Sequence, residues 1–352
     1  MKKFIGSLAI ISLIMLAGCG GTADQKKEKN ANKVATTAST DLAKVEVQEG
    51  NYVILPDVSE DELSTIALKM KVTNTSKGKL SLTARNFVLY EAGDDEKIKA
   101  EDVYADELNV LDYDTLSKDK STTGSIFFNI DPKKEYKLVF EAMNDNGDNE
   151  DVELTLDMAK YEDSKEGFKE SENAANAFLD VQFLNNENEN YAKLVANDKE
   201  ETKAEFLKTY KKENEDRLFS ELTLSDQDYQ NCFNSFTSTQ GKRAKLNTEL
   251  SAYYGDQAIL EITLDEALSN SSIYDLSYQY ERNYIDSSDN YDYDAAEKYA
   301  YSKYTEILEK SPLKSESDEI HLYLKKKDGK WYVDLDEMHN EQTISAFLGN
   351  IY

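Results

Sequence analysis

The sequence predicts a multidomain protein in which an all-β sandwich precedes an α+β domain. Between residues 44 and 158, apolar and polar residues alternate in short runs. From residue 168 onward, apolar residues first recur at helical spacing and then alternate again. A third observation concerns the start of the chain, where residues 4–16 form its most apolar run.

The first residues have the features of an export signal. Lys2 and Lys3 form a short positive segment ahead of the apolar run. That run is shorter than the roughly 20 apolar residues that a membrane-spanning helix needs. We therefore expect residues 1–18 to be a signal peptide.

A cysteine follows the apolar run directly, in the sequence Leu16-Ala17-Gly18-Cys19. These four residues resemble the lipobox of bacterial lipoproteins. The resemblance implies recognition of Leu16, Ala17 and Gly18 by the signal peptidase and cleavage before Cys19. It also implies a diacylglyceryl anchor, with palmitate-type chains, on the Cys19 thiol and a position on the extracellular face of the cell membrane; two acyl chains suffice for stable anchoring. The alternative is an ordinary secretory signal whose cysteine is incidental.

The charge balance excludes two classes of partner. The chain has 41 Lys and Arg residues against 69 Asp and Glu residues, a formal net charge of −28. Nucleic acids and anionic lipid surfaces both require a basic face. We therefore expect no nucleic-acid partner, and membrane contact through the lipid anchor alone.

Composition also sets the expected domain bounds. Residues 19–43 comprise the lipidated cysteine and a small, polar, Lys-rich tether. Residues 44–160 form the β-sandwich, and residues 168–352 form the α+β domain. A turn-rich acidic stretch separates the two domains.

The β-sandwich is expected from about seven short alternating runs. They lie at residues 45–47, 66–72, 80–82, 87–90, 125–130, 136–140 and 152–156. Asn146-Gly147, between the last two runs, predicts a hairpin turn, because both residues tolerate positive φ. The acidic loop around Gly147 does not match a calcium loop, since Ala142 would stand at the first ligand position.

A longer resemblance covers residues 44–158. The run IALKMKVTNTSKGKLSLTARNFVLYE, followed by STTGSIFFNI and YKLVFEA, is similar to an immunoglobulin-like, telokin-like domain of unknown function found in many Gram-positive lipoproteins. The similarity implies an immunoglobulin-like sandwich, and that family implies no catalytic residues.

The second half of the chain predicts helices followed by an antiparallel meander. We expect helices over residues 174–183, 202–219, 225–236, 272–285 and 294–310, and strands over 246–252, 258–264, 320–324 and 331–335. Ser225 and Asp228 have the spacing of a capping box. Cys232 shares a helical face with Tyr229 and Phe236 and is expected to be buried and inert.

Helices followed by a meander that ends in KKDGKWYVDL resemble small lipoprotein domains, and the nuclear-transport-factor-like cone is the nearest architecture. The C-terminal half as a whole is similar to an uncharacterised lipoprotein domain of low-GC Gram-positive bacteria.

Tyrosine is the unusual feature of the second half, with nine of the 23 tyrosines between residues 274 and 304. Tyrosine supplies a large amphipathic contact area, which suits interfaces and ligand clefts. The candidate surface for a ligand or partner comprises Tyr274, Tyr278, Tyr280, Tyr284, Tyr301, Tyr304 and His321. The alternative is that these tyrosines pack half-buried helices.

The two histidines offer little for catalysis. His321 is out of phase with Ile320 and Leu322, so it faces the opposite side of its strand. His339 is expected in a solvated polar loop without zinc-ligand spacing. The sequence contains no recognised nucleophile, zinc, phosphate-loop or dinucleotide motif. We therefore expect no catalytic residue, no metal and no cofactor.

The expected function is non-enzymatic binding or scaffolding in the envelope of a Gram-positive cell, with an envelope protein or a small ligand as partner. The alternative is a small-ligand receptor or cone-fold enzyme with a Tyr/Asp-lined pocket in the C-terminal domain. A transport-system solute-binding protein is disfavoured, because 14 glycines and a β-only first half do not supply two α/β lobes.

Replacing Cys19 by alanine is expected to leave a precursor that incorporates no fatty acid, since the thioether requires a thiol. Growth with labelled palmitate followed by immunoprecipitation measures this. Cys232→Ala is the matched control and should label like the wild type. Equal labelling of the Cys19→Ala variant would refute the anchor.

Overall fold

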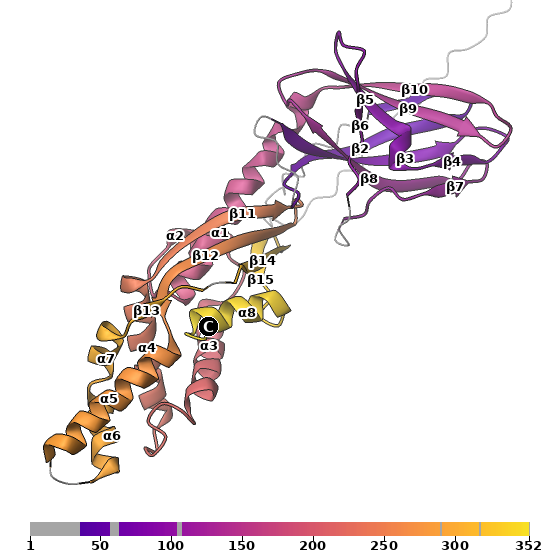
Figure 1. Cartoon of the computed structure of the whole chain (residues 1–352). Coiled ribbons are helices and arrows are strands. Elements are labelled where there is room, and N and C mark those ends of the chain that lie inside the picture. Colours follow the sequence, from indigo (N-terminus) through magenta and orange to yellow (C-terminus); the bar gives the residue numbers. More distant parts are fainter. Residues whose placement is uncertain (1–35, 57–62, 104–107, 289–290, 317, 352) are drawn as a thin grey trace, which may run out of the picture. The chain divides into compact units, whose positions relative to one another are not determined.

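The computed structural model describes residues 36–56, 63–103, 108–288, 291–316 and 318–351 (Figure 1). The expected signal peptide, the residues Leu16–Cys19 and the tether up to residue 35 lie outside the described residues. Antiparallel sheets form the N-terminal part, and helices with a further sheet form the C-terminal part, in agreement with a multidomain α+β organisation. Among the described residues, no helix is long and apolar enough to cross a membrane.

Two antiparallel sheets make up the N-terminal part. One has the strand order β1-β2-β3-β8, and the other has the order β6-β5-β9-β4-β7 with β10 paired to β9. The strands are β1 (Thr36–Ser39), β2 (Ala43–Val53), β3 (Ser64–Asn74), β4 (Leu80–Leu82), β5 (Phe87–Glu91), β6 (Lys97–Lys99), β7 (Asp114–Leu116), β8 (Ser121–Ile130), β9 (Tyr136–Asn144) and β10 (Asn149–Leu156).

Alternation along the strands builds one core from both sheets. Leu68 and Met70 of β3 are fully buried, and so are Phe87 of β5 and Phe140 of β9, whose rings lie 4.7 Å apart. The predicted hairpin at Asn146-Gly147 is confirmed, because β9 pairs with β10 across a turn in which Gly147 has a φ of +85°.

The chain enters the sheet earlier than its composition indicates. Thr36–Ser39 form β1 and pair with β2, and Leu42 and Ala43 are buried. The prediction of a tether extending to residue 43 is therefore wrong for these last residues. A polar strand that pairs along one edge has no alternating apolar signal of its own.

The C-terminal part contains a five-stranded sheet, ordered β11-β12-β14-β15 with β13 paired to β12, and eight α-helices within the described residues. A short 3₁₀ segment, Met158–Lys165, precedes α1 (Glu166–Gln182), α2 (Glu189–Leu194), α3 (Lys199–Asn214) and α4 (Asp226–Arg243). Then follow β11 (Lys245–Tyr253), β12 (Gln257–Leu268), α5 (Asn270–Ser288), α6 (Tyr293–Ser302), α7 (Tyr304–Lys310), β13 (Leu313–Lys314), β14 (Ile320–Lys327), β15 (Lys330–Val333) and α8 (Met338–Phe347).

Several local predictions hold, and others differ from the structure. Ser225 and Asp228 form the predicted capping box at the start of α4. Cys232 is buried, as predicted, and burial raises the pKa of its thiol to about 12. The helix predicted over 202–219 ends at Asn214, and the helix predicted over 294–310 is divided at Lys303 into α6 and α7. The helices α2 and α8 were not predicted.

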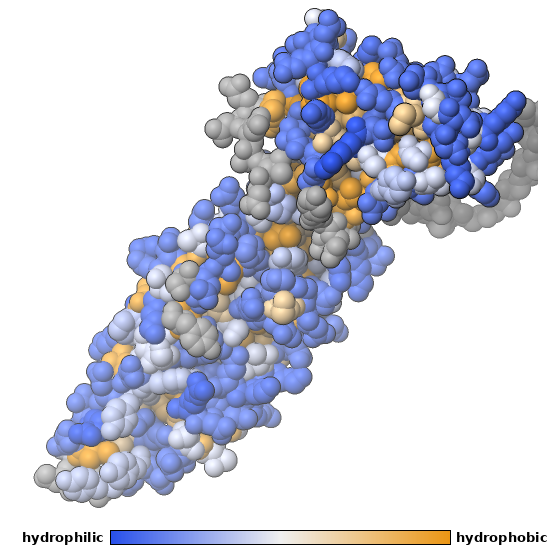
Figure 2. Space-filling view, turned by 45° about the vertical axis from the view of Figure 1, so that its right-hand side comes forward, coloured by the Kyte–Doolittle hydropathy of each residue, from blue (hydrophilic) through white to orange (hydrophobic). Residues whose placement is uncertain are grey.

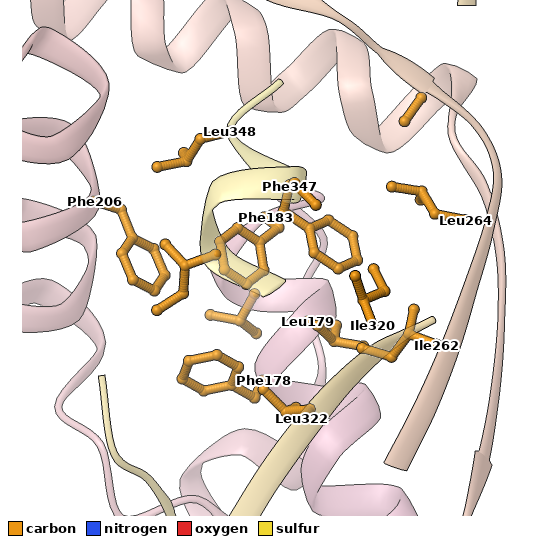
Figure 3. Packing of buried hydrophobic residues seen from close by; sticks show 14 of the residues in the cluster. Phe178, Leu179, Phe183, Phe206, Ile262, Leu264, Ile320, Leu322, Phe347 and Leu348 are labelled. Atoms are coloured by element: carbon orange, nitrogen blue, oxygen red, sulfur yellow. The ribbon is translucent and has the colours of Figure 1, made fainter. Parts of the chain in front are cut away.

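Aromatic side chains fill the space between the sheet and its helices (Figure 3). The ring of Phe183 stacks between Phe206 of α3, 4.8 Å away, and Phe347 of α8, 4.7 Å away. Ile262 and Leu322 of the sheet belong to the same core. The space between the sheet and its helices is therefore packed with apolar groups.

The buried amide of Asn340 attaches α8 to the sheet. β15 pairs only with Leu324–Lys327, so the edge of β14 at Tyr323 is open to α8. The Asn340 Oδ1 atom accepts from the Tyr323 N–H at 2.8 Å, and its Nδ2 atom donates to the carbonyls of Tyr323 and Asp334 at 3.0 and 2.9 Å. One turn further along α8, the Thr343 hydroxyl donates to the His321 carbonyl at 2.7 Å.

Asn340→Ala is expected to lower the free energy of unfolding of the C-terminal part by about 2–4 kcal/mol, because one N–H and two carbonyls lose a buried partner. Asn340→Asp is also expected to destabilise, since an ionised carboxylate cannot donate to the two carbonyls. Urea unfolding followed by the fluorescence of Trp331, the single tryptophan, measures the change. Asn283→Ala on the exposed face of α5 is the control. Destabilisation below about 0.5 kcal/mol by Asn340→Ala would contradict this role for the amide.

Candidate ligand-binding site

A pocket with a cavity volume of about 310 Å³ opens beside β14, β15 and the start of α8. Tyr323 and Lys325 of β14 line it, together with Ile259 of β12, which pairs with Tyr323. The neighbouring residues Leu322 and Leu324 are buried in the core. Because side chains alternate along a strand, the pocket lies largely on the sheet face that points away from the core.

Two stacked rings form one wall of the pocket. The Tyr323 and His339 rings lie 4.6 Å apart, with 20° between their planes. The His339 Nδ1 atom lies 2.8 Å from the Glu337 Oε1 atom. Glu337 is also the N-cap of α8, and its Oε2 atom accepts from the Asn340 N–H at 2.9 Å. The helix start therefore fixes the histidine ring against the tyrosine.

These contacts set the hydrogen-bonding roles of Glu337 and His339. Partial burial disfavours the ionised form of Glu337, but the hydrogen bonds from His339 and from the Asn340 N–H outweigh it and lower the pKa of Glu337. An ionised carboxylate only accepts hydrogen bonds, so the His339 Nδ1 atom is the donor. In the neutral ring, the Nε2 atom is then the acceptor.

A charged pair lies at the other side of the pocket. The Lys325 Nζ atom donates to the Asp334 Oδ2 atom at 2.7 Å, and this hydrogen bond lowers the pKa of Asp334. The same ammonium lies 5.9 Å from the centre of the Tyr332 ring, which also lines the pocket. The pocket thus combines aromatic faces with fixed polar groups, the composition of a small-ligand site.

No cluster of three or more His, Cys, Asp or Glu residues in the described ranges is arranged to hold a metal ion.

The structure separates the tyrosines of the predicted surface into two groups. Tyr304 is buried, and its hydroxyl bonds to that of Tyr210. Tyr274 and Tyr301 are half-buried, and their hydroxyls donate to Asn214 at 3.0 Å and to Asp228 at 2.8 Å. The assignment of Tyr304 to an exposed surface is wrong, because its ring belongs to the core and a second tyrosine satisfies its polar end.

The second group lies on α5 and α6. Tyr278 is 57% exposed, and the half-buried Tyr280 and Tyr284 both stack on Tyr299, with ring centres 6.5 and 5.2 Å away. Tyr293 of α6 is 65% exposed. We call these five residues the tyrosine face. Figure 2 shows pale and orange residues between hydrophilic ones at the end of the molecule where α5 and α6 lie.

The pocket is lined by His339 and not by His321. His321 is on the predicted face of β14 but pairs with Glu261 across the strands and does not line the pocket. His339, expected in a solvated loop, lines the pocket because the chain forms α8 after residue 337. The helical spacing of Ile344, Phe347 and Leu348 was the sequence signal for this helix.

Comparison with known proteins gives a family and a relative. Residues 161–348 match the model of a domain of unknown function (DUF5105), and residues 29–152 match that of another domain of unknown function (DUF4352). The chain is 25% identical to the uncharacterized lipoprotein YcdA of Bacillus subtilis over 99% of this chain and 98% of that protein. The crystal structure of the ycdA lipoprotein from Bacillus subtilis covers 89% of this chain with a TM-score of 0.63 at 24% identity, and this chain covers 98% of it.

The expected resemblance to a lipoprotein built from two domains of unknown function is thereby confirmed. Since the DUF5105 model spans more than half of the residues, the chain belongs to the DUF5105 family.

Proposed function

We propose that the protein is a lipid-anchored binding protein on the extracellular face of a Gram-positive cell membrane, and that its C-terminal domain binds the ligand. The lipobox-like sequence Leu16-Ala17-Gly18-Cys19 and the similarity to a lipoprotein over almost the whole chain support the anchor. Residues 1–18 would be removed, and Cys19 would carry the palmitate-type chains.

We also propose that the exported chain folds into two domains. An immunoglobulin-like sandwich extends from β1 to about residue 160, and an α+β domain with a nuclear-transport-factor-like arrangement occupies residues 168–352. Two sheets around one core support the first assignment, and helices that share one core with an antiparallel sheet support the second. The phenylalanine-filled interior argues against the cone-fold enzyme alternative and favours a ligand at the surface pocket.

The pocket at Tyr323 and His339 would bind a small polar ligand that has a flat apolar face, such as a sugar unit of a wall glycan. The observation that carries this proposal is the Tyr323–His339 stack, fixed by Glu337. An aromatic platform contacts the apolar face of such a ligand, and the adjacent histidine and carboxylates bond its hydroxyls. The cavity of about 310 Å³ is at the small end of the range for ligand sites.

Tyr323→Ala is expected to weaken binding of an N-acetylglucosamine tetramer, the saccharide probe, by about tenfold, because the aromatic platform is lost. Isothermal titration of the full chain in mild detergent measures the affinity. Tyr323→Phe keeps the ring and should change the affinity less than about threefold. Tyr278→Ala, on the tyrosine face, is the matched control. If the tetramer binds Tyr323→Ala as well as the wild type, or does not bind the wild type, the saccharide proposal fails.

A second candidate function, contact with an envelope protein, is favoured by the exposure of the tyrosine face. Tyrosine side chains give a large contact area at small entropic cost and are enriched in interface hot spots. The stacking of Tyr280 and Tyr284 on Tyr299 holds these rings in place before any partner arrives.

A photo-crosslinking residue at position 278 is expected to capture one defined envelope protein on intact cells, since Tyr278 is 57% exposed on this face. Gel analysis after irradiation and mass spectrometry of the adduct measure the capture. The same residue at position 143, where Met143 is 59% exposed in the N-terminal part, is the control. Identical adducts from both positions would rule out a specific tyrosine-face partner.

A further inference from the structure

A second cavity, separate from the pocket at Tyr323, lies between α3 and α8. Its volume is about 500 Å³. Glu205, Thr209 and Glu213 line it from α3, and Met338 and Glu341 line it from α8. On each helix these residues recur three or four positions apart, so they lie on one face of it. We call this cavity the α3–α8 groove.

The floor of the groove is apolar and its walls are acidic. Phe206, Leu335 and Ile344 supply apolar lining, and Met338 is 62% exposed at the groove. Four carboxylates line the groove, namely Glu205, Glu213, Asp336 and Glu341, and its lining contains no lysine or arginine.

Two of these carboxylates are free of cationic partners in the described part of the chain. Glu205 pairs with Lys208 at 2.8 Å, outside the lining. Asp336 and Glu341 form no ion pair with a described residue. A ligand that brings positive charge therefore finds two carboxylates available.

Glu213 also lines the groove, from α3. Its Oε2 atom is buried and has no hydrogen-bond partner within the described residues. Burial raises the pKa of Glu213, while the Asn350 hydrogen bond and the nearby Lys212 and Arg217 act in the opposite direction. Because this oxygen is closed to solvent, a bound segment would contact Asp336 and Glu341 instead.

We propose that the α3–α8 groove binds a short basic segment of a partner protein, with an aliphatic side chain on the apolar floor and lysine or arginine side chains on Asp336 and Glu341. Charge complementarity selects a basic occupant, and the apolar floor selects one that also carries an apolar anchor. The eight steps from Glu205 to Glu213 correspond to about 12 Å along α3, the length of about four extended residues. The net charge of −28 also attracts such a segment from a distance.

The test measures binding of the fluorescein-labelled peptide Lys-Leu-Arg-Leu to the full chain in mild detergent by fluorescence anisotropy. The double variant Asp336→Asn with Glu341→Gln is expected to weaken binding by at least about fivefold. The control variant Asp265→Asn with Glu309→Gln removes the same charge at exposed positions outside the groove and should change the affinity less than about twofold. Raising the salt concentration should weaken binding to the wild type, because it screens the charges.

Four results would overturn the proposal, and the first three concern the peptide. They are equal binding of Glu-Leu-Glu-Leu, equal binding of Lys-Ser-Arg-Ser, and an equal loss of affinity in the groove and control variants. Binding of spermine without binding of the peptide would replace the peptide segment by a small polycation and also overturn it. Unfolding curves of both double variants identify any loss that comes from misfolding, and Tyr323→Ala should leave peptide binding unchanged because Tyr323 does not line this groove.

Discussion

The side-chain amide of Asn340 holds α8 against the sheet, and both cavities of the C-terminal part depend on α8. A strand edge normally pairs with another strand, but β15 is too short to cover β14 at Tyr323. One buried side chain supplies both a donor and an acceptor there, as a paired backbone would. An isolated ten-residue helix is marginal in water, so α8 needs such tertiary contacts to exist at all.

The position of α8 then determines both cavities. Its first residues, Glu337 and His339, complete the pocket at Tyr323, whereas Met338 and Glu341 face the α3–α8 groove. Further along the helix, Ile344 also lines the groove, whereas Phe347 stacks on Phe183 in the core. Different residues of this one short helix thus contribute to the core, to a polar pocket and to an acidic groove. A shift of the helix would therefore alter all three together.

The tyrosines show which structural features can be predicted from residue spacing and which cannot. Spacing predicted the capping box at Ser225, the burial of Cys232 and the hairpin at Gly147, because each depends on residues close in the chain. Spacing could not decide between Tyr278 and Tyr304. A tyrosine ring is stable in a core when its hydroxyl finds a partner, and the partner of Tyr304 is Tyr210, 94 residues away.

The pocket at Tyr323 and His339 was not predicted for the same reason, because it depends on residues far apart in the chain. His339 reaches Tyr323 across 16 positions only because α8 folds back on the sheet, and no local pattern near His339 encodes that return. Polar residues around it indicated a loop, yet Glu337 in that same stretch is the helix cap. The sequence also did not predict that phenylalanine rings fill the core. Phe183, Phe206 and Phe347 come from three separate helical segments and their termini.

The burial of Cys232 has a practical consequence for following the protein in cells. The chain has two cysteines, and the Cys232 thiol, buried and with a pKa of about 12, is closed to thiol reagents in the folded protein. Reactivity toward a maleimide at neutral pH therefore reports the Cys19 thiol alone. If Cys19 carries the proposed anchor, lipidated chains would not react with the maleimide and chains without the lipid would be labelled. The native sequence would then distinguish the two populations without an added tag.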